Sequence, residues 1–221
     1  MHAVRNPNKI DMGRLIAVSI FTFFIILNIF VVYKDIGTLF PVNMIKAAAL
    51  IHHLLVVCFY ALIILVYFLR SSASSTSRSF ITNAIAVLTT FAPPALSYLS
   101  RSELTKPGVF LLADLIIVLG MILSIYSLSS LGRSFSIIPQ ARKLVQSGPY
   151  RLVRHPLYLG ELIGLFGIVL AGLTIPKIAV FLLIVTCQVY RAFQEEKLLA
   201  DVFPEYKEYC LRTARFIPGV F

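Results

Sequence analysis

Residues 147–160 read Ser-Gly-Pro-Tyr-Arg-Leu-Val-Arg-His-Pro-Leu-Tyr-Leu-Gly and lie between two long hydrophobic segments. Gly148-Pro149 is typical of a turn, and Pro156 suits the first turn of a helix, where its missing N–H costs no hydrogen bond. His155 is therefore expected at the entrance of a helix, where free backbone N–H groups and the positive end of the helix dipole favour an anionic group. The run predicts both the start of a helix and a functional site.

The composition around this run indicates a membrane protein. The chain has 221 residues, of which 14% are charged, and its mean hydropathy is +0.87. A soluble domain carries roughly 25% charged residues. Several apolar runs reach about 20 residues, the length that a helix needs to cross a bilayer. We therefore predict an all-α fold, a polytopic transmembrane helical bundle with a C-terminal helical hairpin and a cytosolic tail.

The apolar runs divide the chain into two regions, 1–131 and 132–221. The first is expected to hold four N-terminal transmembrane helices, at about 12–33, 44–69, 80–99 and 109–131. The second is expected to contain a polar loop at 132–155, a helical hairpin at 156–193 and a tail at 194–221. Gly172 and Pro176 would split the hairpin into two halves of about 17 residues, barely enough to cross a bilayer core.

The connections between these helices are expected to be short. We expect tight turns around Gly37 and Pro41 and at residues 100–108, and a polar loop without structure of its own at residues 70–79. Pro93-Pro94 is expected to kink the third helix.

Lysine and arginine counts predict the orientation. With the N-terminus inside, 15 of the 20 basic residues lie in cytosolic segments, which include the 132–155 loop and the tail. The net charge of +10 has the same explanation, so no nucleic-acid partner is expected. The prediction is a multi-pass integral membrane protein with both termini cytosolic, in a bacterial inner membrane or the endoplasmic reticulum.

The sequence predicts no metal site, and its cysteines are uninformative. Cys58, Cys187 and Cys210 are far apart and show no ligand spacing. His52 and His53 are adjacent, so their side chains leave a helix about 100° apart and make poor joint metal ligands. A packed or hydrogen-bonded role is expected for them. The first apolar run is too long for a cleavable signal.

Arg191, Glu195 and Glu196 lie at the end of the hairpin. Residues four apart share one helix face, so Arg191 and Glu195 form either a surface ion pair worth ~0.3–0.5 kcal/mol or one wall of a pocket under the 132–155 loop. Tyr206 and Tyr209 belong either to an interfacial aromatic belt or to the cover of a ligand. Asp114 either contributes to a polar path or reaches water near its helix end.

Four motifs together resemble a known family. They are Leu144-Val145-x-Ser147-Gly148-x-Tyr150, Arg154-His155-Pro156-x-Tyr158-x-Gly160, Glu195-Glu196-x-x-Leu199 and Pro204-Glu205-Tyr206-x-x-Tyr209. This pattern is similar to that of the isoprenylcysteine carboxyl methyltransferases, within the phospholipid methyltransferase-like superfamily. The resemblance covers about residues 132–221 and makes them the expected catalytic region.

The resemblance implies a membrane enzyme that binds S-adenosylmethionine at the cytosolic edge of the bilayer. Arg191 would position the acceptor, and Arg191 and Glu195 would be the catalytic pair. The implied methyl-donor site consists of Gln140, Arg142, Lys143, Leu144, Val145, Tyr150, His155, Pro156, Leu157, Tyr158 and Glu195.

The expected acceptor is lipophilic, enters from the bilayer, and carries a carboxylate as in isoprenylcysteine carboxyl methylation. The tail, Arg215-Phe216-Ile217-Pro218, is closer to bacterial and lipid-methylating members. A phospholipid or another small lipophilic molecule methylated on nitrogen, sulfur or oxygen is therefore the alternative. An amine would have to lose a proton, with Glu195 or Tyr150 assisting. The rival classes are an NADPH-dependent membrane reductase and a non-catalytic scaffold or transporter.

Overall fold

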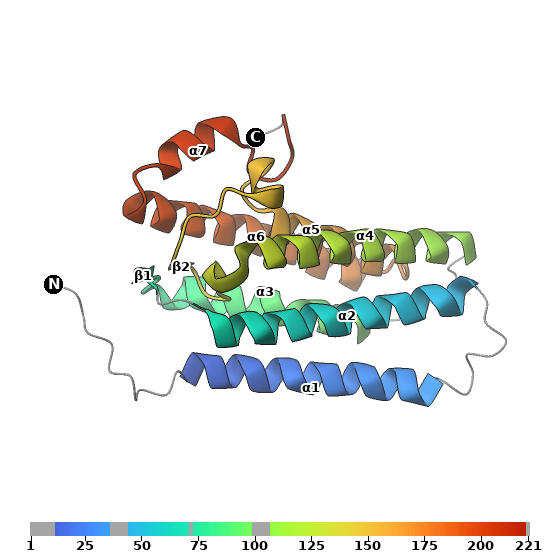
Figure 1. Ribbon diagram of the computed structural model, residues 1–221. Helices are drawn as coiled ribbons and strands as arrows, with labels where there is room; N and C mark the ends of the chain where they lie inside the picture. The colour runs from blue at the N-terminus through green and yellow to red at the C-terminus, as the bar shows by residue number, and fades with distance from the viewer. Residues whose placement is uncertain (1–11, 36–43, 71–72, 99–106, 220–221) are drawn as a thin grey trace.

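The computed structural model describes residues 12–35, 44–70, 73–98 and 107–219. In this part of the chain the helices lie side by side in one bundle, with α7 across one end (Figure 1). The helices are α1 (Met12–Asp35), α2 (Met44–Leu69), α3 (Phe80–Tyr98), α4 (Pro107–Leu131), α5 (Pro156–Leu170), α6 (Ile175–Val202) and α7 (Tyr206–Arg212). The predicted all-α bundle is confirmed.

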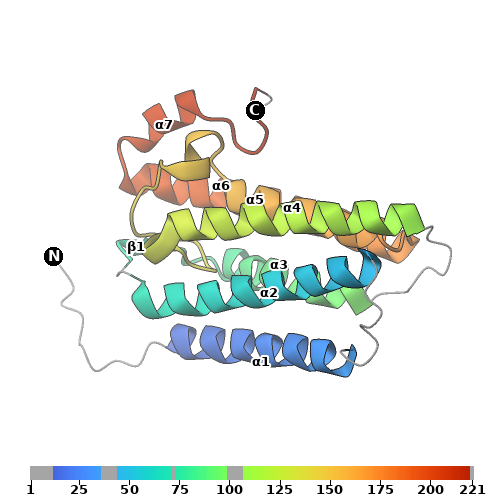
Figure 2. The ribbon, with the colours of Figure 1, turned by 45° about the vertical axis from the view of Figure 1, so that its right-hand side comes forward.

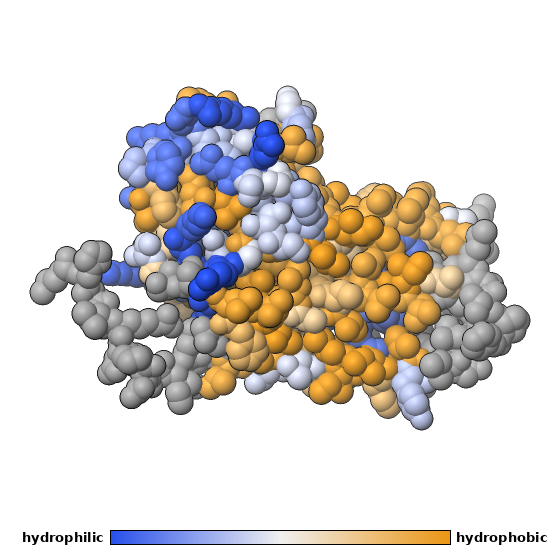
Figure 3. Space-filling model, viewed as in Figure 1, coloured by the Kyte–Doolittle hydropathy of each residue, from blue (hydrophilic) through white to orange (hydrophobic). Residues whose placement is uncertain are grey.

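The outer faces of the bundle are apolar. Four helices, α1, α2, α4 and α6, are long and apolar enough to cross a membrane, and α3 and α5 contribute shorter apolar segments in the described part. Figure 3 shows hydrophobic surface along most of the bundle and hydrophilic surface gathered at the end where α7 lies. The chain is therefore a multi-pass integral membrane protein.

One end of the bundle collects polar segments that are far apart in the sequence. The views in Figures 1 and 2 agree that α2 and α4 end here and that α3 and α5 begin here. Residues 73–79, 132–155 and 203–219 therefore meet at this end, which we call the polar end. The expected meeting of the 132–155 loop with the tail is confirmed, and the assignment of this end to the cytosol stays a prediction.

The C-terminal hairpin has unequal arms. The side-chain oxygen of Thr174 accepts a hydrogen bond from the backbone N–H of Lys177 at 3.4 Å, and Pro176 lies in the first turn, so α6 begins where the sequence indicated. However, α5 has 15 residues and α6 has 28. The predicted half of about 17 residues agrees with α5, whereas α6 runs on past 193 into the tail because no helix breaker follows Pro176 until Pro204.

The polar segment at 70–79 is not without structure. Strand β1 (Ser75–Thr76) pairs antiparallel with β2 (Gln140–Ala141) of the 132–155 loop. Flanking backbone bonds continue the contact, from Ser74 N to Ala141 O at 2.7 Å and from Ser77 N to Pro139 O at 3.0 Å. The prediction failed because this pairing uses backbone groups from distant segments, which leave no local sequence pattern.

Glycines allow α4 and α5 to pack at very short distance. A Cβ placed on Gly160 would lie 2.5 Å from Ser124 Oγ and 2.8 Å from Gly120 O, so only glycine fits there. Gly160 therefore allows the close approach of α4 to α5. A Cβ placed on Gly164 would have no heavy atom within 4 Å, so a small side chain would fit at this position. The contact fixes α5, whose first turn enters the site described below.

Three other expectations concern the membrane helices. His53 Nδ1 lies 3.0 Å from Asn28 Oδ1, which confirms a hydrogen-bonded role for His53. Asp114 is 8% exposed, so it does not reach open water. Helix α3 continues across Pro93-Pro94 as helix, and the side chains at that predicted kink lie outside the described residues. The expected basic N-terminus at 1–11 and the turns at 36–43 and 99–106 lie outside them as well.

Candidate active site

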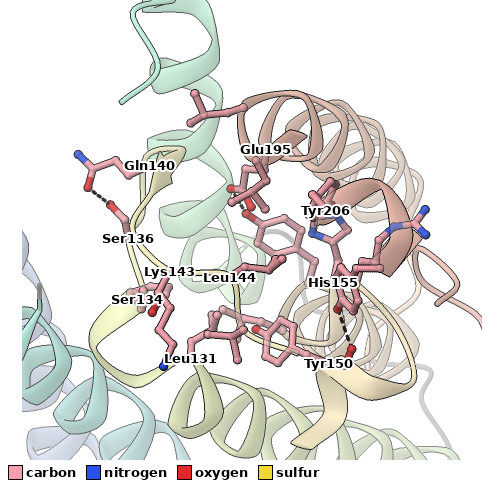
Figure 4. Close-up of a pocket in the computed structure, with 18 of the residues that line it drawn as sticks. Leu131, Ser134, Ser136, Gln140, Lys143, Leu144, Tyr150, His155, Glu195 and Tyr206 are labelled. Atoms are coloured by element: carbon pink, nitrogen blue, oxygen red, sulfur yellow. Dashed lines mark hydrogen bonds between the residues drawn. The ribbon is translucent and has the colours of Figure 1, made fainter. Parts of the chain in front are cut away.

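A cleft opens at the polar end, between the 132–155 loop, the start of α5, the end of α6 and the tail (Figure 4). About 820 Å³ of space lies within it, the open mouth included. Nine of the eleven residues implied as donor-binding line this cleft. They are Gln140, Lys143, Leu144, Val145, Tyr150, His155, Leu157, Tyr158 and Glu195. Arg142 and Pro156 do not line it, because Arg142 bonds to Gln140 and Pro156 is buried in α5.

Tyr150 is placed by a tight turn. Gly148 has a φ of 59°, a left-handed conformation that favours glycine, and Pro149 and Tyr150 follow in the 3₁₀ helix η3 (Gly148–Arg151). The Tyr150 carbonyl accepts a hydrogen bond from the Tyr209 hydroxyl at 2.6 Å. Burial raises the pKa of Tyr150 well above its usual value, so its hydroxyl stays protonated at neutral pH.

Glu195 is oriented from two sides. The Tyr158 hydroxyl donates a hydrogen bond to Glu195 Oε1, and Arg191 Nε donates to the same oxygen at 3.3 Å. The guanidinium carbon of Arg191 also lies 4.7 Å from the centre of the Tyr158 ring. The side chain of Glu195 keeps 21% of its surface exposed, whereas that of Arg191 keeps 4%. Of the two interpretations of this pair, the surface ion pair is therefore wrong.

Arg191 lies under the cleft and not in its wall. Its guanidinium donates to the carbonyl of Ile137 and to Thr89 Oγ1, the latter at 3.3 Å. These bonds fasten the 132–155 loop to α3 and α6. Arg191 can hold an acceptor carboxylate only if it exchanges one of these partners for the acceptor.

Glu196 lies at the centre of a cluster that the sequence analysis did not assign. Its Oε1 accepts from Arg154 Nε at 2.8 Å and lies 3.2 Å from His155 Nε2. Arg215 donates to both oxygens, from Nε at 3.0 Å and from Nη2 at 2.8 Å. The His155 ring in turn stacks on the Tyr158 ring, with centroids 5.3 Å apart. Glu196 therefore ties the start of α5 and the tail to the end of α6.

Backbone bonds hold the tail against the start of α5. The N–H groups of Arg154 and His155 donate to Ala214 O at 2.8 Å and to Arg215 O at 3.1 Å. The expectation that free N–H groups around His155 bind an anion is wrong for the N–H groups of Arg154 and His155, because both already donate to backbone carbonyls of the tail. Lys143, which lines the cleft, is a cation outside this cluster.

The tail closes one side of the cleft with two tyrosines. Tyr206 and Tyr209 line it and contact each other edge to face, with centroids 5.8 Å apart. Burial raises the pKa of Tyr206 and raises that of Tyr209 to about 12, so both hydroxyls are protonated. Of the two roles considered for this pair, a cover of the cleft agrees with the structure.

Other lining residues gave no signal in the sequence. They are Leu131, Ser134, Phe135, Ser136, Ile138 and Leu198, together with Arg154 and Leu199, which the motifs contained without a role. Most of them are apolar or small, and in a sequence they resemble ordinary helix-packing positions. The charge pairing of Arg154 and Arg215 with Glu196 was the one signal available, since all three are charged residues flanking apolar segments.

The comparison with protein families covers the segment that builds this cleft. Residues 109–206 match the phospholipid methyltransferase family. That family contains isoprenylcysteine carboxyl methyltransferase-like proteins, so the resemblance expected from the sequence is confirmed.

Two curated proteins are similar to this chain. Cobalt-zinc-cadmium resistance protein CzcN of Cupriavidus metallidurans is 38% identical over 114 residues, which are 48% of this chain and 50% of the relative. Nickel-cobalt-cadmium resistance protein NccN of Alcaligenes xylosoxydans xylosoxydans is 35% identical over 81 residues, 36% of this chain and 38% of the relative. The chain thus spans half or less of the length of the curated relatives it matches.

Proposed function

We propose that this chain is an integral membrane methyltransferase that uses S-adenosylmethionine and acts on a lipophilic acceptor. One observation carries the proposal: one cleft at the polar end of the bundle is surrounded by side chains from separate segments, namely Lys143, Tyr150, His155, Tyr158 and Glu195. The match of residues 109–206 to a methyltransferase family supports it.

The lining residues fit this cofactor by their chemistry. S-Adenosylmethionine supplies, when bound, an electrophilic methyl group on a sulfonium sulfur. Glu195 offers a carboxylate to the ammonium or hydroxyl groups of the cofactor, and Lys143 offers a cation to its carboxylate. The rings of Tyr150, Tyr206 and Tyr209 can stabilise the sulfonium by cation–π contact worth ~0.5–2 kcal/mol.

The chain contributes to catalysis mainly by orientation. Tyr158 and Arg191 fix the Glu195 carboxylate, and Glu196 fixes His155 and the tail. Tyr206 and Tyr209 cover the cleft and exclude water. Held geometry of this kind is worth up to roughly 7–11 kcal/mol of an activation barrier.

The protein lies in a bacterial inner membrane or in the endoplasmic reticulum. The acceptor enters from the bilayer, and the cofactor arrives from the cytosol. A carboxylate acceptor, as in isoprenylcysteine carboxyl methylation, would be held by the planar fork of Arg191. That requires Arg191 to release Ile137 O or Thr89. A phospholipid or another small lipophilic molecule methylated on nitrogen, sulfur or oxygen requires no such exchange.

Label transfer tests the proposal. The purified protein is incubated with radiolabelled S-adenosylmethionine and total membrane lipid, and the labelled product is identified by mass spectrometry. We expect label in a lipid fraction, strongly reduced in Glu195→Gln and unchanged in Glu208→Gln, an exposed carboxylate on α7. Binding of NADPH with no response to S-adenosylmethionine would indicate the reductase class, and binding of neither nucleotide would indicate a scaffold or transporter.

A further inference from the structure

A second polar cluster lies on α5 and α6, one turn deeper than the cleft. Glu161 follows Tyr158 by one turn on α5, and its Oε2 accepts a hydrogen bond from Gln188 Nε2 of α6 at 2.7 Å. Gln188 is 1% exposed and lies in the apolar part of a membrane-spanning helix. Polar groups at such positions are costly and mark function. None of the contacts that shape the donor cleft uses Glu161 or Gln188.

This cluster lies next to residues that line the cleft. Gln188, Arg191 and Glu195 follow one another at helical spacing on the same face of α6. The charge of Glu161 acts electrostatically on Tyr150 and on Tyr158, both of which line the cleft. A group seated beside Glu161 is therefore close to a group seated in the cleft.

The charges around Glu161 come from every neighbouring element. Arg191 on α6 acts on it with a positive charge and Glu195 with a negative one, while Tyr60 of α2 faces it with a neutral hydroxyl. The cluster of Glu161, Glu195 and Arg191 thus holds two carboxylates and one guanidinium. The excess negative charge favours a neutral or cationic guest over an anionic one.

The cluster also has one unused hydrogen-bond acceptor. Gln188 Oε1 is buried and has no hydrogen-bond partner among the described residues. A buried acceptor left in that state costs about 1–3 kcal/mol. Glu161 keeps part of its surface accessible. Carbonyl and carboxylate oxygens only accept hydrogen bonds, so the missing group is a donor.

We infer that Glu161, held by Gln188, binds the reactive head group of a lipophilic acceptor that carries an N–H, O–H or S–H group, and takes its proton during methyl transfer. The inference rests on the proposed function and names the acceptor class. A lone pair of the acceptor atom forms the bond to the methyl carbon. The bond from that carbon to sulfur breaks with its electron pair going to sulfur, and the acceptor's proton goes to a carboxylate oxygen of Glu161.

Replacement of Glu161 separates this role from donor binding. Glu161→Gln keeps the shape of the side chain but cannot take a proton. We expect S-adenosylmethionine to bind this variant within twofold of the wild type by calorimetry, and turnover on total lipid to fall by roughly 100-fold, the usual share of a general base. Gln188→Leu, of similar volume, should also lower turnover and spare donor binding. Glu208→Gln is the matched control and should change neither.

The product and the pH profile complete the test. The labelled product of the wild type should be an N-, O- or S-methylated lipid that is stable to mild base. The turnover rate of the wild type should fall at acidic pH as Glu161 is protonated, and the residual rate of Glu161→Gln should not show this fall. A base-labile methyl ester, or full turnover in Glu161→Gln, would overturn the inference while leaving the proposed methyltransferase in place. Absence of both donor binding and label transfer in the wild type would overturn the proposed function itself.

Discussion

At the residue scale, two hydrogen bonds to one carboxylate oxygen hold Glu195 in position. Tyr158→Phe removes one donor and keeps the ring that stacks on His155. A lost hydrogen bond to a charged group costs ~1.5–3 kcal/mol, so we expect S-adenosylmethionine affinity to fall by roughly tenfold or more. Calorimetry in detergent measures it, with Tyr190→Phe, outside the cleft, as the control. Unchanged affinity in Tyr158→Phe would mean that Glu195 does not need this contact.

Arg191 is expected to matter for turnover more than for donor binding. Arg191→Ala frees Ile137 O and Thr89 Oγ1 and leaves Glu195 with one donor. The variant should lose turnover and should unfold at lower temperature, since the buried Ile137 O loses its side-chain donor at a cost of about 1–3 kcal/mol, whereas Thr89 Oγ1 keeps its bonds to Ile85 O and Ala86 O. Thermal unfolding and label transfer measure the two effects. A variant with full turnover would contradict the role given to Arg191.

Sequence patterns could predict which residues meet, but not how they bond. The motifs led to nine of the cleft residues because they are close together in two short runs. The Glu196 cluster was missed although its opposite charges gave a signal, because its donors come from Arg154, His155 and Arg215, on both sides of α6 in the sequence. Glu161 gave no signal, since its partner Gln188 lies on the opposite arm of the hairpin.

At the element scale, the α4–α5 contact depends on the absence of particular side chains. Gly160→Ala would place a methyl group 2.5 Å from Ser124 Oγ and against the backbone of α4, so we expect a clear loss of thermal stability and of turnover. Gly164→Ala meets no heavy atom within 4 Å and should behave like the wild type. Equal effects of the two substitutions would contradict the packing described here.

The tail is a separate element that Glu196 holds in place. Glu196→Ala removes the acceptor of Arg154 and Arg215 and leaves buried charges unpaired. We expect faster hydrogen exchange in residues 206–216 and weaker donor binding, because Tyr206 and Tyr209 no longer cover the cleft. Glu208→Ala, an exposed residue on the same tail, is the control. Wild-type exchange in Glu196→Ala would show that backbone bonds alone retain the tail.

Element boundaries followed from local chemistry where a cap or a proline was present. Gly172 and Pro176 predicted where α6 begins, whereas the predicted hairpin ended at 193 and α6 continues to Val202. The strand pair β1–β2 was missed because two-residue strands have no periodicity and their partners lie far apart in the sequence.

At the scale of the whole molecule, hydropathy predicted the bundle and basic residues predicted its orientation. Single cysteines can test that orientation in a background with Cys58, Cys187 and Cys210 replaced by serine. Arg151→Cys lies in an exposed position at the polar end and should react with a membrane-impermeant reagent only from the cytosolic side. Leu173→Cys, 60% exposed in the hairpin turn, should react only from the opposite side. The reverse pattern would invert the proposed orientation.

The central claim is that distant polar segments form one methyl-donor site at the membrane edge. The most direct test is calorimetric titration of S-adenosylmethionine into the purified wild type and into Leu144→Trp, which fills the cleft, with Leu211→Trp, 88% exposed on α7, as the control. We predict saturable binding to the wild type and to Leu211→Trp, and at least roughly tenfold weaker binding, about 1.4 kcal/mol, to Leu144→Trp. No binding to the wild type, or equal binding to all three proteins, would contradict the account.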